Sequence, residues 1–155
     1  MTRLMSSSGG FFSHANLWPD RAWNNRVEQM AIEFSHIVPF LPVRDLKKTI
    51  EYYRDVLGFS KEWYWENTDA GIQRDGMRLL FTNQPAHAAL INSAGWHLEI
   101  CWFVSGVDEL YEEYKKKGVK IVDELQDAPW GTRGFTIEEI NGYCLRIAQG
   151  IEKSE

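Results

Sequence analysis

The sequence predicts an α+β fold in which two βαβββ modules form a curled mixed sheet around a cleft, with the helices outside. Two observations carry this prediction. The order strand, helix, strand, strand, strand occurs twice along the chain, and each predicted helix is followed by a glycine, Gly58 in the first half and Gly118 in the second. Because one such unit cannot bury its sheet face alone, the repeat indicates two halves that share a core.

The first half begins with a strand and a helix. Phe34–Val43 is rich in β-forming and apolar residues but is interrupted by two prolines, which places this strand at a sheet edge or a chain crossing. Asp45 is a good N-cap for a helix that Gly58 ends. Three strands follow, and the last two are joined by the hairpin turn Asp75-Gly76. These strands are predicted over Phe59–Glu66, Ala70–Arg74 and Met77–Thr82.

The second half repeats this order. Trp96–Val104 has the composition of a strand, Val107–Lys117 has apolar residues along one side of a helix, and Gly118 ends that helix. The turn Asn141-Gly142 joins the last two strands. The three strands after the helix are predicted over Lys120–Leu125, Gly134–Glu138 and Tyr143–Gln149.

These elements define the domain organisation. The modules occupy about residues 34–83 and 96–149, within a single domain over residues 31–151. Residues 1–30 precede the repeated pattern, and we interpret them as an N-terminal extension.

Composition and charge exclude several classes of protein. The formal net charge is −5, whereas a nucleic-acid-binding face needs clustered cations. No apolar run approaches the ~20 residues that cross a membrane, and the first thirty residues lack the apolar core of a signal peptide. Cys101 and Cys144 stand in apolar stretches without CxxC spacing, as expected of reduced cytoplasmic thiols. We therefore predict a cytoplasmic protein that binds neither nucleic acid nor membrane.

The aromatic content is high for a chain of this length. Seven Trp, six Tyr and eight Phe make up 14% of the residues, which is more than a small core needs. Large flat side chains outside the core are suited to line a pocket for an extended aromatic ligand.

Several motifs resemble the vicinal-oxygen-chelate superfamily, which includes glyoxalase I, extradiol dioxygenases and bleomycin-resistance proteins. They are found at 38–45 (VPFLPVRD), 52–59 (YYRDVLGF), 107–111 (VDELY), 129–131 (PWG) and 141–143 (NGY). Among the branches, the chain is most similar to the bleomycin-resistance proteins. That similarity rests on the proline early in the first strand, the acidic-aromatic stretch after Gly58-Phe59, the start of the second helix and the Pro-Trp-Gly segment.

The resemblance implies a ligand groove and a homodimer. It matches Glu62 and Trp63 to an acidic and an aromatic residue of the groove in bleomycin-resistance proteins, and Trp130 to the groove tryptophan of their Pro-Trp-Gly segment. It also implies that the first strand crosses to a partner subunit at the proline matched by Pro39. A strand-exchanged dimer of this kind forms two clefts across its interface.

Strand parity adds further candidate residues. Side chains two apart point to the same sheet face, so Glu99 and Phe103 should face the cleft, where Arg146 from the last strand pairs with Glu99. The predicted ligand-binding residues are Glu62, Trp63, Trp65, Glu99, Phe103, Trp130 and Arg146. The alternative for Trp63 and Trp65 is that they cover sheet surface or form a dimer contact, and for Trp130 that it belongs to the core.

Metal-dependent members of the superfamily hold an ion with one His or carboxylate from each of four strands. The matching positions here are Val38, the segment 79–81 (LLF), Glu99 and Arg146. Of these, only Glu99 has a side chain that can bind a divalent ion, and Arg146 is a cation. Divalent ions need several deprotonated donors that converge on one point. We therefore predict no metal. Because the chain also has no phosphate-binding glycine loop, we predict no cofactor.

The function predicted from these observations is metal-independent binding of a small molecule, of the kind that confers antibiotic resistance. The ligand is expected to be flat and aromatic, and carboxylates at the rim also suit a cationic one. No nucleophile motif is present, and no catalytic residue is assigned. Two alternatives stay open. One is a glyoxalase- or dioxygenase-like enzyme with a displaced metal site at His36, His97 and Glu99, and the other is an interaction module whose exposed tryptophans contact a protein partner.

Overall fold

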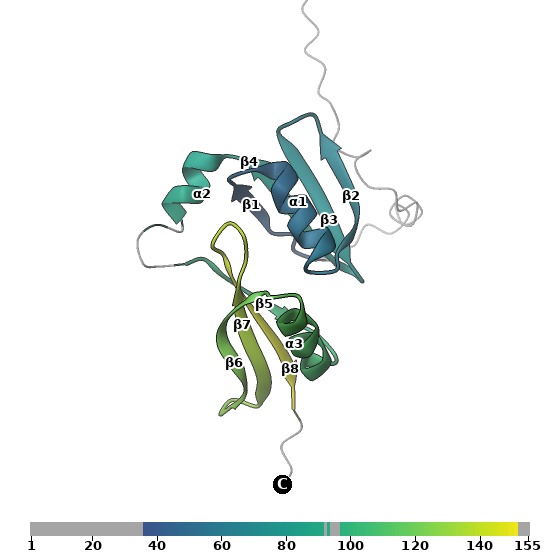
Figure 1. Cartoon of the computed structure of the whole chain (residues 1–155), viewed down its shortest axis with the longest axis vertical. Coiled ribbons are helices and arrows are strands. Elements are labelled where there is room, and N and C mark those ends of the chain that lie inside the picture. Colours follow the sequence, from purple (N-terminus) through teal and green to yellow (C-terminus); the bar gives the residue numbers. More distant parts are fainter. Residues whose placement is uncertain (1–35, 92, 94–96, 152–155) are drawn as a thin grey trace, which may run out of the picture. The chain divides into compact units, whose positions relative to one another are not determined.

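The computed structural model describes residues 36–91, 93 and 97–151 (Figure 1). Within them the chain forms two successive modules, each with a four-stranded mixed sheet. The first sheet has the strand order β1-β4-β3-β2 and the second β5-β8-β7-β6. In each sheet the first strand of the module pairs in parallel with the last, and the other neighbours are antiparallel. The α+β class and the repeated βαβββ order are thus confirmed.

Local sequence signals explain the first module. Its elements are β1 (Phe40–Val43), α1 (Leu46–Asp55), β2 (Ser60–Trp65), β3 (Asp69–Arg74) and β4 (Met77–Asn83), followed by α2 (Pro85–Ile91). Asp45 caps α1, because its carboxylate accepts a hydrogen bond of 2.9 Å from the backbone N–H of Lys48. Gly58 has a φ of 74°, which glycine adopts without strain, and leads the chain into β2.

The second module repeats the first after the loop that follows α2. Its elements are β5 (Glu99–Phe103), α3 (Val107–Lys116), β6 (Lys120–Ala128), β7 (Thr132–Glu138) and β8 (Cys144–Gly150). Helix α3 carries Asp108 and Glu109 in its first turn and Lys115 and Lys116 in its last, an arrangement that the helix dipole favours.

Three features differ from the sequence prediction. The strands form two separate four-stranded sheets instead of one curled sheet, since each module closes its own parallel pair. The first strand covers only Phe40–Val43; residues 36–39 are in no strand, and the extension over 1–30 lies outside the described residues. Helix α2 is absent from the prediction because it buries a single side chain, Ala88, and so shows little amphipathic pattern. Among the residues described, no helix is long and apolar enough to cross a membrane.

One hydrophobic core runs through both modules. The rings of Phe59 and Trp102, which come from different modules, lie 5.6 Å apart between centroids. The hydroxyl of Tyr114 donates a 3.1 Å hydrogen bond to the carbonyl of Leu57, and further along the hydroxyl of Tyr143 donates one of 2.6 Å to the first module. The modules therefore share buried aromatic residues, as the repeat predicts.

Each sheet has a helix-covered face and an opposite face, which we call the open face. Burial alternates along β5: Trp102 is buried on the helix side, whereas Glu99, Cys101 and Phe103 are exposed on the other. Because successive side chains of a strand point to opposite faces, the two faces can be followed from strand to strand through the register.

Candidate functional site

The open face of the second sheet carries most of the predicted ligand-binding residues. Glu99, Cys101 and Phe103 of β5 lie opposite Cys144, Arg146 and Ala148 of β8. On β7, Thr136 lies opposite Arg146 and Gly134 opposite Ala148. On β6, Asp123 lies opposite Thr136 and Gln126 opposite Gly134. This face is therefore a mixture of charged, polar and small side chains, with Phe103 exposed at 72%.

A cavity of about 200 Å³ lies against this open face. Trp130, in the turn between β6 and β7, and Arg146 of β8 both line it. Trp130 is 70% exposed, so its indole ring is available for stacking. Gly134 is part of the lining, where a Cβ atom would come within 2.4 Å of the backbone carbonyl of Ile147. Only glycine allows β7 and β8 to approach this closely beneath the cavity.

Two charged groups of the open face form an ion pair. Arg146 Nε contacts a carboxylate oxygen of Glu99, which was expected from their positions on neighbouring strands. Partial desolvation of the nearby Cys101 thiol chiefly raises its pKa, while Arg146 lowers it and Glu99 raises it. Burial also raises the pKa of the Cys144 thiol. Both cysteines are thus protonated at neutral pH and are poor nucleophiles.

The open face of the first sheet carries Trp63 and Trp65. Trp63 lies opposite Gly71 in the register and Trp65 opposite Asp69, whereas Ala70, between these two β3 residues, is buried in the core. The indole of Trp63 covers Gly71 so closely that a Cβ atom there would lie 2.4 Å from Nε1. Trp65 is 49% exposed. Trp63 is consequently packed on its own sheet, and Trp65 extends into solvent.

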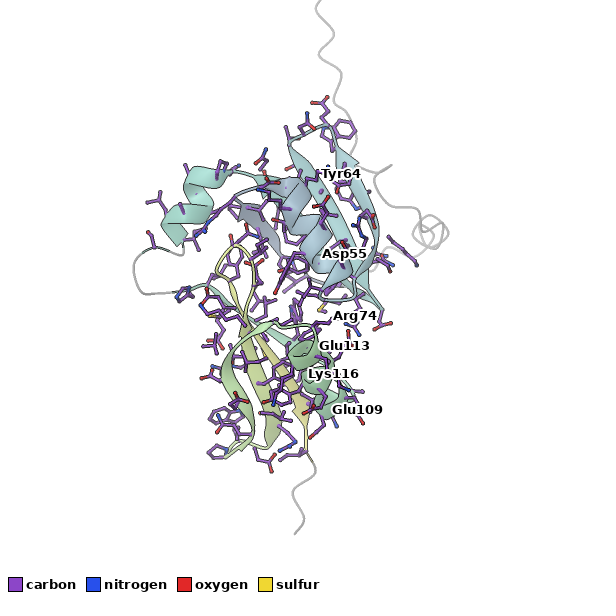
Figure 2. All side chains as sticks on the ribbon, in the orientation of Figure 1. Asp55, Tyr64, Arg74, Glu109, Glu113 and Lys116 are labelled. Atoms are coloured by element: carbon purple, nitrogen blue, oxygen red, sulfur yellow. The ribbon has the colours of Figure 1, made fainter. Side chains whose placement is uncertain are left out.

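Glu62 lies on the other side of β2. Its carboxylate accepts a 3.3 Å hydrogen bond from Arg54 of helix α1, and Tyr64 belongs to the same helix-facing row. Figure 2 labels Tyr64 on β2 and Asp55 at the end of α1. Asp55 is the second carboxylate that Arg54 contacts, at 2.7 Å. Glu62 is thus separated by the sheet from Trp63 and Trp65.

The predicted ligand-binding residues therefore fall into three groups. Glu99, Phe103, Trp130 and Arg146 belong to the second module's open side, Trp63 and Trp65 to the open face of the first sheet, and Glu62 to the helix side of β2. The cavity lining from β6, such as Asp123 and Gln126, is not among the predicted site residues. The predicted strand contained Asp123 but ended at Leu125, before Gln126.

Among the described residues, two side chains of the alternative metal site have other partners. Glu99 is engaged by Arg146, and His97 donates a 2.8 Å hydrogen bond from Nδ1 to the carbonyl of Gly142. His36 lies before β1, in no helix or strand. Within residues 36–91, 93 and 97–151, no three His, Cys, Asp or Glu side chains are grouped so that they could hold an ion.

A buried carboxyl group lies at the turn that follows β7. Glu139 is 3% exposed and accepts hydrogen bonds from the backbone N–H groups of Asn141 and Tyr143, at 2.7 and 3.1 Å. It also accepts one of 3.1 Å from the side-chain amide of Asn141, whose oxygen in turn accepts from the Arg44 backbone N–H. Burial raises the pKa of Glu139 to about 7. From the sequence alone, this segment is predicted only as a hairpin turn.

Comparison with known proteins agrees with the repeated topology. The bleomycin resistance proteins of Geobacillus stearothermophilus and Staphylococcus aureus are each 27% identical to this chain over 136 residues, covering 74% of this chain and 96% of theirs. A solved bleomycin resistance determinant encoded on the transposon Tn5 is 26% identical, with a TM-score of 0.62 over 76% of this chain and 98% of that one.

A second solved structure has the same fold. The bleomycin-binding protein of bleomycin-producing Streptomyces verticillus, in complex with copper(II)-bleomycin, has a TM-score of 0.62 and is 21% identical, over 79% of this chain and all of that one. The family model of the glyoxalase/bleomycin resistance protein/dioxygenase superfamily matches residues 33–147, which span both modules. On its sequence and its fold, the chain belongs to the glyoxalase/bleomycin resistance protein/dioxygenase superfamily.

Proposed function

We propose that this protein binds and sequesters a flat aromatic small molecule without the help of a metal ion. The observation that carries the proposal is the cavity between Trp130 and Arg146 on the open face of the second sheet. An exposed indole beside a polar floor can stack on an aromatic ring and hydrogen-bond to its substituents. The relatives named as bleomycin resistance and bleomycin-binding proteins support a small-molecule ligand of this kind.

A binding role agrees with the chemistry of the surrounding groups. The thiols of Cys101 and Cys144 have raised pKa values, and the carboxylate of Glu99 is held by Arg146. A group that donates or accepts protons in catalysis must be available to the substrate and titrate near the working pH. None of these three side chains supports that role, whereas stacking and shape need neither a nucleophile nor a metal.

We also propose that the working protein is a homodimer. Large apolar side chains remain exposed on the open faces, including Phe40 at 55%, Trp65 at 49% and Phe103 at 72%. Exposed apolar groups of this size mark binding surfaces. A second copy of the chain that covers part of each open face would enclose the cavity and leave a groove for the ligand.

Ligand binding is tested with Trp130→Ala and with Tyr64→Ala as the matched control, because Tyr64 is an exposed aromatic residue on the helix side of β2. Calorimetric titration with a panel of flat aromatic compounds that includes bleomycin should identify at least one that binds once per chain. Trp130→Ala removes the stacking surface and should then lower the affinity for that compound by about tenfold. The control should leave its affinity unchanged.

The metal-free part of the proposal is tested on the same sample. Elemental analysis should find no stoichiometric transition metal, and exhaustive treatment with EDTA should not change the affinity for the compound. A bound metal that EDTA removes together with binding would overturn the proposal in favour of an enzyme. Equal affinities of wild type and Trp130→Ala would show that the cavity is not the binding site.

A further inference from the structure

Most carboxylates around the cavity have a cationic partner. Glu99 is paired with Arg146, and Asp127, which also lines the cavity, contacts Arg133 at 2.8 Å. Glu138, further along β7, contacts Lys120 at 2.8 Å. Each of these carboxylates already faces a cation, which weakens its attraction for a cationic ligand.

Asp123 differs from these carboxylates. It lines the same cavity and is exposed, yet it forms no ion pair within the part of the chain that the structure describes. In the register it lies opposite Thr136, which in turn lies opposite Arg146, so its side chain belongs to the open face. Its negative charge is also one of the secondary causes that raise the pKa of the Cys144 thiol on that face, after burial.

We infer that Asp123 is the counter-ion that makes this cavity prefer a planar aromatic cation, with the ring stacked on Trp130. This inference rests on the proposed function and deepens it by naming the ligand class and the residue that selects it. A neutral ring placed over the cavity would displace water from the Asp123 carboxylate and offer no interaction in place of that hydration, which costs free energy. A cationic ring compensates for the lost hydration by charge attraction and also gains cation–π attraction to the indole.

The volume of the cavity limits the size of a suitable probe. About 200 Å³ is enough space for a fused two-ring system. N-methylquinolinium and 2-methylquinoline form a matched pair, because they have the same carbon and nitrogen atoms and differ in that the first is a permanent cation. At pH 8 the second is uncharged. The difference between their affinities therefore reports the contribution of charge.

The experiment compares wild type, Asp123→Asn and Asp127→Asn. The Asp127 variant is the matched control, since it removes the same formal charge from the same cavity but from a carboxylate that already contacts Arg133, a guanidinium shared with Asp108. Binding is followed by two-dimensional NMR through the indole N–H resonance of Trp130, assigned with Trp130→Phe. Dissociation constants are measured for both probes at low and at high salt.

The wild type is expected to bind N-methylquinolinium about fivefold to tenfold more tightly than 2-methylquinoline at low salt. Asp123→Asn should remove most of this preference by lowering the affinity for N-methylquinolinium alone. Asp127→Asn should retain the preference to within about twofold. High salt should reduce the preference in the wild type, because the attraction is between exposed charges.

Two results would overturn the inference, and they are distinguishable. If both probes shift the Trp130 resonance but Asp123→Asn keeps the wild-type preference, the cavity binds aromatic rings and Asp123 is not the counter-ion. If neither probe shifts the resonance at millimolar concentration, the cavity does not bind small aromatic rings, and the proposed function fails together with the inference.

Discussion

The carboxyl group of Glu139 holds the turn between β7 and β8 in place. Within the described part of the chain, it accepts three hydrogen bonds from Asn141 and Tyr143, two and four residues further along. Asn141 in turn reaches the first module, where its amide nitrogen donates a 3.1 Å hydrogen bond to the hydroxyl of Thr49. One buried side chain thereby orders a turn, and the turn connects the two modules. Burial of such a carboxyl disfavours its charged form.

The stability of the protein should therefore depend on the ionisation of Glu139. Its pKa is raised from 4.5 to about 7 in the folded chain. Below pH 4.5 both states hold the proton, and the contribution to stability is fully present. Between pH 4.5 and 7 the unfolded state ionises first, so stability falls as pH rises and the loss is complete above pH 7. The loss is on the order of 1–3 kcal/mol.

Thermal unfolding of wild type and Glu139→Gln between pH 5 and 8.5 measures this effect. The variant does not titrate at this position and loses one acceptor to Asn141, so it should be the less stable protein at pH 5. Its disadvantage should shrink as pH rises from 5 to about 7 and stay constant above that. A difference in Tm that stays constant over the whole range would contradict the raised pKa of Glu139.

At the scale of single elements, the sequence predicts those features that depend on neighbours along the chain. Asp45 as the N-cap of α1 and Gly58 after that helix are predicted from the residues next to them, and the structure confirms both. The extent of β6 depends on pairing with β7, which includes two register shifts, and it is therefore underestimated. Lys61 has a φ of 53° and lies in the bulge between Ser60 and Trp63, a feature for which the sequence has no signal.

The candidate site was predictable only in part. Glu62 and Trp63 are consecutive residues of β2 and therefore face opposite sides of the sheet, although motif matching groups the two. The repeat predicts both the turn that carries Trp130 and the strand that carries Arg146, and these two residues do line one cavity. Asp123 was missed because its place depends on the register of a strand pair and not on any motif.

The packing of β2 on β3 leads to a prediction for two neighbouring tryptophans. Trp63→Ala removes the indole that covers Gly71, and should lower the free energy of unfolding by about 1–3 kcal/mol. Trp65→Ala is the matched control, because this side chain is half exposed, and it should cost less than about 0.5 kcal/mol. Urea denaturation followed by circular dichroism measures both. Equal losses in the two variants would show that Trp63 does not stabilise the sheet through Gly71.

For the whole molecule, the shared core and the open faces have different consequences. Contacts such as that between Arg74 and Glu113, 3.4 Å apart and both labelled in Figure 2, join elements of the two modules. Together with the buried aromatic residues, they should make the modules unfold as one unit. The open faces contribute nothing to this core within one chain, and their apolar side chains remain exposed. Association is the means by which such surfaces are removed from water.

Light scattering coupled to gel filtration should therefore give about twice the chain mass of 18.0 kDa at micromolar concentration. Phe40→Glu places a charge on the exposed side of β1 and should shift the protein toward the monomer, since burying an unpaired carboxylate is costly. Leu90→Glu, at an exposed apolar position on α2, is the matched control and should leave the mass unchanged. Monomeric wild-type protein that still binds an aromatic ligand would contradict the dimer and place the complete site within a single chain. Loss of both dimer and ligand binding in Phe40→Glu, with secondary structure retained, would show that the second copy completes the groove.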